Sequence, residues 1–240
     1  MTTFDVNNEA DLNNAIDVID TNSFPINYVI DITGPITLTS QIEAINLQSG
    51  ATLTIQGTNG SGGAQVQTID GANFSGFFVY SGDVTIQDLT LQNMKAQGGG
   101  GGNLAGGGAG LGGGLFVAGT NGSGGNNPSQ AIVPVVTLVD VNFSGDQAVG
   151  GHGGSGNGGD LAGGGGGLDG GHGGNNNDLA SGGGGGGGVG LGAAGGNFTG
   201  GVSAGSGGAG IIAGAASGGH GSSIFGGNGG ASGGGGGASP

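Results

Sequence analysis

The sequence predicts an all-β fold built as a solenoid of short strands, and three observations support this. After one helical segment, apolar residues recur with a period of two in short runs rich in β-branched side chains. Two of these runs repeat, as VTIQDLTLQN from Val84 and VTLVDVNFSG from Val136. Glycine accounts for 72 of the 240 residues, of which only nine lie in residues 1–97. The chain therefore consists of an ordinary foldable half and a glycine-rich half.

The first predicted element is an amphipathic helix over about residues 9–20. Asn8 is a favourable N-cap residue, and Asp11 follows three positions later. Apolar residues then recur at helical spacing, at Leu12, Ala15, Ile16 and Ile19. This pattern indicates a helix that buries one face.

Short strands are predicted to follow the helix, separated by Gly, Asn, Asp and Ser. They are Tyr28–Ile32, Ile36–Leu38, Thr52–Ile55, Val66–Ile69, Phe77–Val79, Val84–Ile86 and Leu89–Leu91. Such strands suit a sandwich, a barrel or a solenoid, and the internal repeat favours the solenoid. The repeat aligns without a gap, so Asp88 matches Asp140. We therefore expect the apolar residues of the two runs to stack in one core, with Leu89 and Leu91 beside Val141 and Phe143.

Several motifs resemble a known family: FDVNNEADLNNAI, YVIDITGPITL, LTIQG, QTIDG, VTIQDLTLQN and GGAGLGGGLFVAG. Over about residues 4–151 they are similar to the right-handed parallel β-helix of the pectate-lyase-like superfamily, in particular to passenger regions of secreted bacterial autotransporters and adhesins. The resemblance implies that the helix caps the N-terminal end of the solenoid. The expected organisation is a cap at 1–20, β-helix coils at 21–151 with a glycine-rich excursion at 98–114, and a glycine-rich region at 152–240 that packs on or extends the solenoid.

The glycine-rich region has too few large apolar side chains to offset the entropy of ordering its backbone. Order there requires hydrogen bonds between backbones that approach closely because side chains are absent. We therefore expect a polyglycine-II-like arrangement or thin β-layers. Since such layers have open edges, self-association into filaments or bundles is also expected.

The charge balance excludes several partners. A net charge of −14 with Lys95 as the single basic residue leaves nothing to neutralise phosphates, so neither nucleic acid nor an anionic membrane is an expected partner. The chain has no cysteine and no apolar run long enough for a transmembrane segment. Its first residues do not resemble a signal peptide. From the resemblance we nevertheless expect an extracellular or cell-surface location.

An enzyme is not expected, and no catalytic or cofactor-binding residue is predicted. Lyases of the resembled superfamily use basic residues, of which only Lys95 is present, and hydrolases need clustered carboxylates. The aspartates at 70, 83, 88 and 140 occur singly, in predicted turns or strand ends. The sequence thus favours a non-catalytic structural or adhesive protein that forms a rigid rod or fibre. A carbohydrate-binding or carbohydrate-cleaving β-helix is the alternative, and a surface glycan is a possible partner.

Metal binding is the remaining possibility, although no metal site is predicted. GGSGNGGDLAGG and GGHGGNNNDLASGG resemble calcium-binding nonapeptide repeats, but Asp160 and Asp178 come directly before Leu, without the intervening residue of that repeat. His152 and His172 share a GGHGG context and are weak candidates for a transition metal. A calcium-dependent secreted module is therefore a second alternative function, with calcium as a possible cofactor.

Overall fold

The computed structural model describes residues 1–22, 24, 26–118, 133–155, 163–175, 187–189, 193–197 and 205–208. The chain divides into two compact units. We call residues 1–95 and 112–147 the strand unit, and residues 96–111 and 148–240 the glycine-rich unit. The chain passes between the units after residues 95, 111 and 147.

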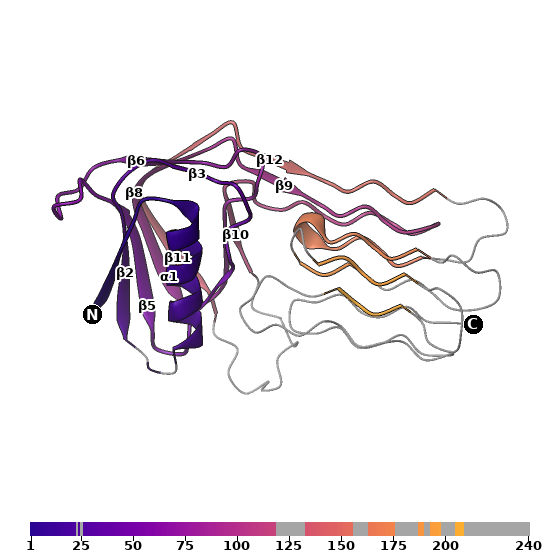
Figure 1. The fold of residues 1–240 in the computed structure, drawn as a ribbon, viewed down its shortest axis with the longest axis horizontal. Helices are drawn as coiled ribbons and strands as arrows, with labels where there is room; N and C mark the ends of the chain where they lie inside the picture. Colours follow the sequence, from indigo (N-terminus) through magenta and orange to yellow (C-terminus); the bar gives the residue numbers. More distant parts are fainter. Residues whose placement is uncertain are drawn as a thin grey trace. The chain divides into compact units, whose positions relative to one another are not determined.

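One helix and a series of mostly parallel strands make up the described secondary structure (Figure 1). In chain order the elements are β1 (Thr2–Val6), α1 (Glu9–Thr21), β2 (Asn27–Ile32), β3 (Ile36–Thr37), β4 (Ile45–Asn46), β5 (Thr52–Gly57), β6 (Gln67–Asp70), β7 (Phe77–Ser81), β8 (Asp83–Gln92), β9 (Lys95–Gln97), β10 (Leu115–Val117), β11 (Val135–Ser144), β12 (Gln147–Val149) and the 3₁₀ turn η1 (Leu168–Gly170). A seven-stranded sheet has the order β1-β2-β5-β8-β6-β3, with β11 also paired to β8. A second sheet has the order β10-β7-β4, and β9 pairs with β12.

The predicted all-β, right-handed parallel β-helix is wrong. The chain has a mixed α/β fold in which the strands form separate parallel sheets of seven, three and two strands, without closing into a solenoid. The physical reason lies in the short elements. β3 and β4 have only two residues each, and residues 39–44 between them form no regular strand.

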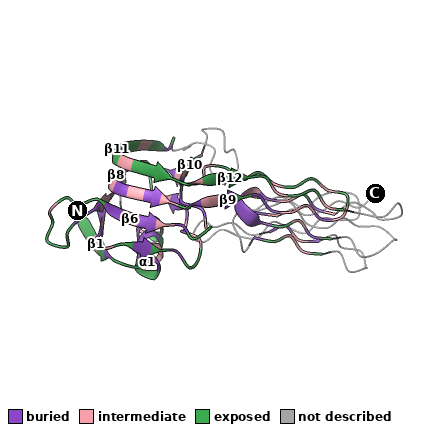
Figure 2. Ribbon diagram, turned by 90° about the horizontal axis from the view of Figure 1, so that it is seen from above, coloured by how far each residue is buried: buried purple, intermediate pink, exposed green. Residues whose placement is uncertain are grey.

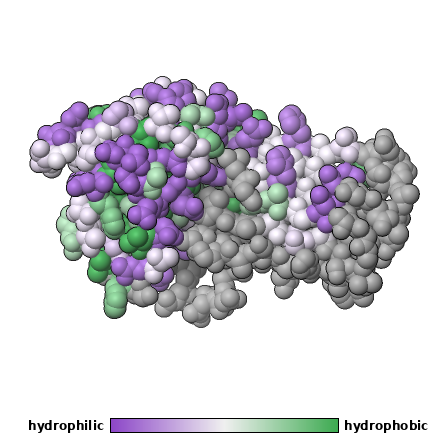
Figure 3. Space-filling view, viewed as in Figure 1, coloured by the Kyte–Doolittle hydropathy of each residue, from purple (hydrophilic) through white to green (hydrophobic). Residues whose placement is uncertain are grey.

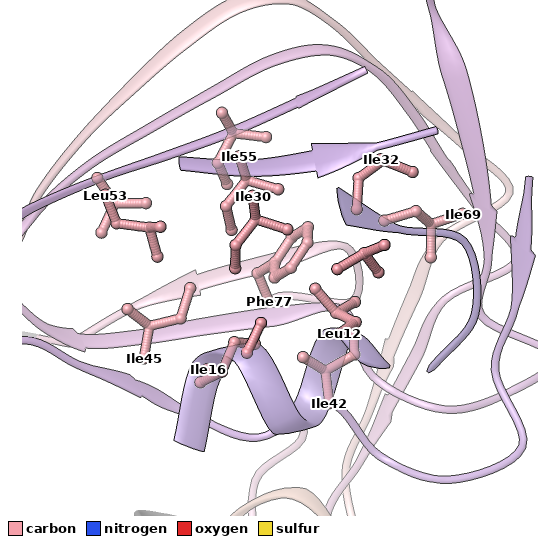
Figure 4. Close-up of a cluster of buried hydrophobic side chains, with 14 of the residues drawn as sticks. Leu12, Ile16, Ile30, Ile32, Ile42, Ile45, Leu53, Ile55, Ile69 and Phe77 are labelled. Atoms are coloured by element: carbon pink, nitrogen blue, oxygen red, sulfur yellow. The ribbon is translucent and has the colours of Figure 1, made fainter. Parts of the chain in front are cut away.

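Helix α1 confirms the first sequence prediction. The Asn8 side chain accepts a hydrogen bond from the Asp11 backbone N–H at 2.9 Å, which caps the first turn. The apolar side chains at helical spacing are all buried, and they contact the strands through Leu12 and Ile16 among others (Figure 4). Burial of this face fixes α1 against β1, β2 and β4.

Five strands of the large sheet run in one continuous parallel register, in the order β1-β2-β5-β8-β11. One row of aligned residues consists of Phe4, Ile30, Ile55, Ile86 and Leu138. The three central isoleucines are completely buried, whereas Leu138 at the end of the row is 44% exposed. Figure 2 shows the same change from the buried β8 to the largely exposed β11. The apolar core therefore thins at β11.

The sequence repeat predicted the pairing of β8 with β11. Val84 pairs with Val136, Leu89 with Val141 and Leu91 with Phe143, as the gapless alignment requires. Asp88 and Asp140 both have positive φ, at 54° and 51°. They lie at matching positions of the two strands but are not themselves paired, and regular pairing resumes at the next residue. Before Asp88 strand β8 pairs with β5, and after it with β6. The repeated aspartate thus marks a bend that the two strands share.

The polyglycine-II or thin β-layer arrangement predicted for the glycine-rich unit is not supported either. From residue 98 to 111 and from 150 onwards, the described segments form neither regular strands nor regular helices, apart from η1. Non-glycine residues interrupt the glycine runs. Successive N–H groups of one segment bond to different neighbours, and bonds to the same neighbour recur only at every third residue, as from Gly98 to Val149 and from Gly101 to His152. The described segments therefore form no β-ladder.

Replacing Ile55 by alanine should lower the free energy of unfolding by about 2–5 kcal/mol, because it leaves a cavity at a completely buried position. Val66→Ala, at a side chain that is 56% exposed, is the matched control and should cost under about 0.5 kcal/mol. Urea denaturation followed by circular dichroism measures both changes. Equal effects of the two variants would contradict the burial described for β5.

Candidate functional site

The glycine-rich unit is cross-linked by hydrogen bonds between backbones far apart in sequence. The segment from Gly98 to Gly110 takes part in many of them. The Gly99 N–H donates to the Gly167 carbonyl at 3.0 Å, and the Gly102 N–H to the Gly164 carbonyl at 2.9 Å. Further bonds join Gly154 to Ala105, Gly173 to Gly100, Gly187 to Gly165 and Gly195 to His172. The sequence-based expectation that backbone groups pair between glycine-rich segments is confirmed for these residues.

Close approach of these backbones requires glycine. A Cβ atom on Gly99 would overlap the carbonyl oxygen of Gly171, and one on Gly108 would overlap that of Gly167. Gly106, in the same segment, has no atom within 4 Å of the position a Cβ would take. The unit therefore has positions where any side chain is excluded beside others where one fits. Its described residues on the face in Figure 3 are mostly close to neutral in hydropathy, as expected of glycine.

His152 and His172, the histidines considered as metal ligands, form hydrogen bonds with backbone groups of the glycine-rich unit. The His172 imidazole Nδ1 accepts a hydrogen bond from the Gly100 N–H at 3.0 Å, and the His152 carbonyl accepts one from the Gly101 N–H at 2.8 Å. Both residues thus accept hydrogen bonds from the same glycine segment, His172 through its side chain and His152 through its backbone carbonyl. Asp160 and Asp178 lie outside the described residues. Within the described part of the chain, no three His, Cys, Asp or Glu side chains are grouped to hold a metal ion.

The aspartates considered for catalysis have structural positions. Asp88 and Asp140 form the shared bend of β8 and β11. Asp70 accepts hydrogen bonds from the Ala72 N–H at 2.9 Å, from Gln92 Nε2 at 2.8 Å and from Asn93 Nδ2 at 2.9 Å, which together lower its pKa. Lys95 lies in β9, where its N–H donates to the Phe74 carbonyl at 2.8 Å.

Sequence reasoning missed a carboxylate clamp at the start of α1. The buried Glu9 side chain accepts hydrogen bonds from the Thr39 N–H at 2.7 Å, the Thr39 hydroxyl at 2.6 Å, the Ser40 N–H at 2.8 Å and the Ser40 hydroxyl. Burial raises the Glu9 pKa, but the hydrogen bonds from Ser40 and Thr39 outweigh it and lower the pKa to about 2. The partners are some 30 residues away, so no local pattern reveals the clamp.

A second buried carboxylate, Asp20, lies in the last turn of α1. Its side chain is only 6% exposed, and both of its oxygens accept from the Asn46 N–H, at 3.0 and 2.9 Å. Burial raises the Asp20 pKa to about 7 against the lowering effect of that hydrogen bond, and the negative charges of Asp17 and Glu43 raise it further. The sequence holds a signal of this burial that the prediction missed: Asp20 follows Ile16 by four residues and Leu12 by eight, so helical spacing places it on the buried face of α1.

The outermost strand β11 presents apolar side chains to solvent. Val135 is 51% exposed, Val139 44% and Phe143 42%. Among the strands that the structure describes, β11 pairs only with β8, so it has a second edge. At ten residues β11 is as long as any strand described, and it exposes several large apolar side chains.

The described helices give no candidate for a transmembrane segment, because none is both long and apolar enough to cross a bilayer. This agrees with the sequence, in which no apolar run reaches that length.

Stability of the strand unit should fall between about pH 4 and pH 7 because of Asp20. Its pKa of about 7 in the folded chain exceeds the ordinary value of 3.8, so the folded state binds the proton more tightly and loses up to about 4 kcal/mol as the group ionises. Asp20→Asn should remove most of this fall, whereas Asp83→Asn, at an exposed position, should keep it. Thermal unfolding at several pH values measures both. An unchanged pH profile in Asp20→Asn would contradict the burial of an ionisable group there.

Glu9 should act in the opposite direction. Its pKa of about 2 is below the ordinary 4.5, so its contribution to stability is complete above about pH 4.5 and is lost as the pH falls towards 2. Glu9→Gln should cost on the order of 2 kcal/mol at pH 6, because the amide NH₂ cannot accept the hydrogen bonds of Thr39 or Ser40. Between pH 4.5 and 3, the free energy of unfolding of wild type should fall because Glu9 is protonated, and Glu9→Gln should lack this fall. Urea denaturation of both proteins at several pH values in this range measures the difference.

No protein-family model, curated protein or solved structure matched the chain in sequence or fold. The family resemblance drawn from the motifs of residues 4–151 therefore stays a prediction. The function is inferred from the geometry of the two units alone.

Proposed function

We propose that the protein is a non-catalytic structural protein whose glycine-rich unit joins copies of the chain into fibres or bundles. The observation that supports this most is the dense set of backbone hydrogen bonds between glycine segments whose Cβ positions overlap neighbouring carbonyl oxygens. These segments hold together without side-chain interactions, because their backbone N–H and C=O groups are the binding groups.

Addition of further copies would use the same backbone groups. A segment on the outside of the hydrogen-bonded glycine segments offers N–H and C=O groups to any further segment of similar shape. A second copy of the chain has segments of the same composition, without side chains that keep backbones apart. When the glycine-rich unit adds copies in one direction, the product is an open assembly rather than a closed oligomer.

The charge of the chain sets conditions for this assembly. Copies that each have a net charge of −14 repel one another, so association should be stronger at higher ionic strength. An extracellular or cell-surface location stays a prediction, as does a surface glycan partner.

Gly108→Ala should weaken assembly and raise amide hydrogen exchange in the glycine-rich unit, because the new Cβ overlaps the Gly167 carbonyl oxygen. Gly106→Ala adds the same methyl group two residues away, where there is space, and should be neutral or slightly stabilising. Electron microscopy of the purified full chains, with exchange measured by mass spectrometry, compares them.

The proposal requires that wild type and Gly106→Ala form the same filaments or bundles and that Gly108→Ala forms fewer or none. Wild-type chains that stay monomeric at high salt would contradict it. So would assembly that is equally strong in both variants.

A further inference from the structure

We infer that two copies of the chain pair through their β11 strands, edge to edge and antiparallel, about a twofold axis. The inference goes beyond the glycine-rich assembly, because it places a second, closed contact on the strand unit. It is independent of whether the glycine-rich unit forms fibres.

The first support is the state of β11 itself. The strand has ten residues, and only one of its two edges pairs with β8. Two of its core-facing side chains are partly exposed, Leu138 at 44% and Phe143 at 42%. Their partners on β8, Ile86 and Leu91, are completely buried. A further strand beside β11 would bury the last row of the core as the earlier rows are buried.

The second support is the difference between the two ends of the strand row. At the β1 end, helix α1 contacts β1 and β2 and covers the core, and its exposed side includes Asp11 and Asp17. An apolar β11 from another copy would meet acidic side chains there. The β11 end has no such cover among the described elements, and the same end of a second copy offers a matching apolar strand.

The third support is the self-complementary pattern of β11 about its bend. Antiparallel pairing centred between Val139 and Asp140 places Val136 opposite Phe143 of the second copy, and Leu138 opposite Val141 of the second copy. All four residues belong to the row that faces the core, as their pairing with β8 shows. Thr137 lies opposite Asn142 of the second copy on the other face. Because the bend at Asp140 is at the centre of this register, both strands bend at the same place.

This antiparallel register also predicts an electrostatic repulsion between the two copies. Each exposed Asp140 lies opposite Val139 of the second copy, so the two Asp140 carboxylates come close to the axis and repel. Pairing should therefore strengthen with salt and in Asp140→Asn.

Disulfide trapping tests the register, because the chain contains no cysteine of its own. Full-length Thr137→Cys and Asn142→Cys chains are mixed under mild oxidation. Residues directly opposite in an antiparallel pair have Cα atoms about 4.5–5.5 Å apart, within the range of a disulfide. We expect a linked dimer that contains one chain of each variant, and little linkage when either variant is oxidised alone.

A mixture of Thr137→Cys with Thr3→Cys is the competing arm. If β1 of another copy instead continued the parallel register beyond β11, Thr3 would lie beside Thr137, because aligned residues of the row run from Thr3 through Val29, Thr54 and Thr85 to Thr137. A stronger link in this arm would overturn the twofold pairing in favour of head-to-tail addition.

Sedimentation velocity of the cysteine-free chain completes the test. Leu138→Asp should convert dimers to monomers, whereas Val66→Asp, at an exposed position outside β11, should leave them intact. Equal sedimentation of wild type and Leu138→Asp would overturn the pairing. If Gly108→Ala abolishes filaments while dimers of the cysteine pair still form, the two contacts are separate. If filaments form without that cysteine link, the pairing is wrong and the proposed function stands.

Discussion

Hydrogen bonding between backbones of neighbouring extended segments is the interaction on which both units depend. In the strand unit it sets the parallel register from β1 to β11, and the register in turn aligns the apolar rows. In the glycine-rich unit it joins segments with almost no side-chain burial to support it. The two units thus differ in what accompanies the backbone bonds, and this determines how each tolerates substitution. The first is sensitive to loss of apolar volume, and the second to addition of a side chain at close-approach glycines such as Gly99 and Gly108.

The two buried carboxylates of α1 show that similar burial has different consequences. Glu9 accepts hydrogen bonds from five donor groups, on Asn13, Thr39 and Ser40, and stays ionised. Asp20 has a single N–H donor and two acidic neighbours, and it retains its proton to about pH 7. The chain has one Lys and no Arg, so side chains that could form a salt bridge with a buried acid are scarce. Backbone N–H and hydroxyl groups must take that role, and where they are few the acid protonates.

Local patterns predicted local structure well, and the repeat predicted one long-range contact. Asn8 and the apolar spacing after it placed α1 within one residue of its observed end, and the gapless alignment of Val84 with Val136 gave the register of β8 and β11. Closure into a solenoid was not predictable in the same way, because it depends on segments such as residues 39–44, which have no repeat partner and form no regular strand. The Glu9 clamp joins residues about 30 positions apart, for which sequence periodicity holds no information. In the glycine-rich unit the need for backbone pairing follows from composition, but the choice of partners does not, since one glycine run is interchangeable with another.

The shared bend at Asp88 and Asp140 has a consequence for how such a chain tolerates insertions. Between β8 and β11 the chain leaves the strand unit, passes through residues 96–111 and returns at Gly112, yet the two strands pair residue for residue. Registration is therefore set locally by the strands and their matching aspartates, and not by the length of what lies between them. A change in the length of the excursion would leave the sheet in phase, so the cost of an insertion near Gly106 would fall on the hydrogen bonds of the glycine-rich unit, such as that from the Gly166 N–H to the Gly106 carbonyl.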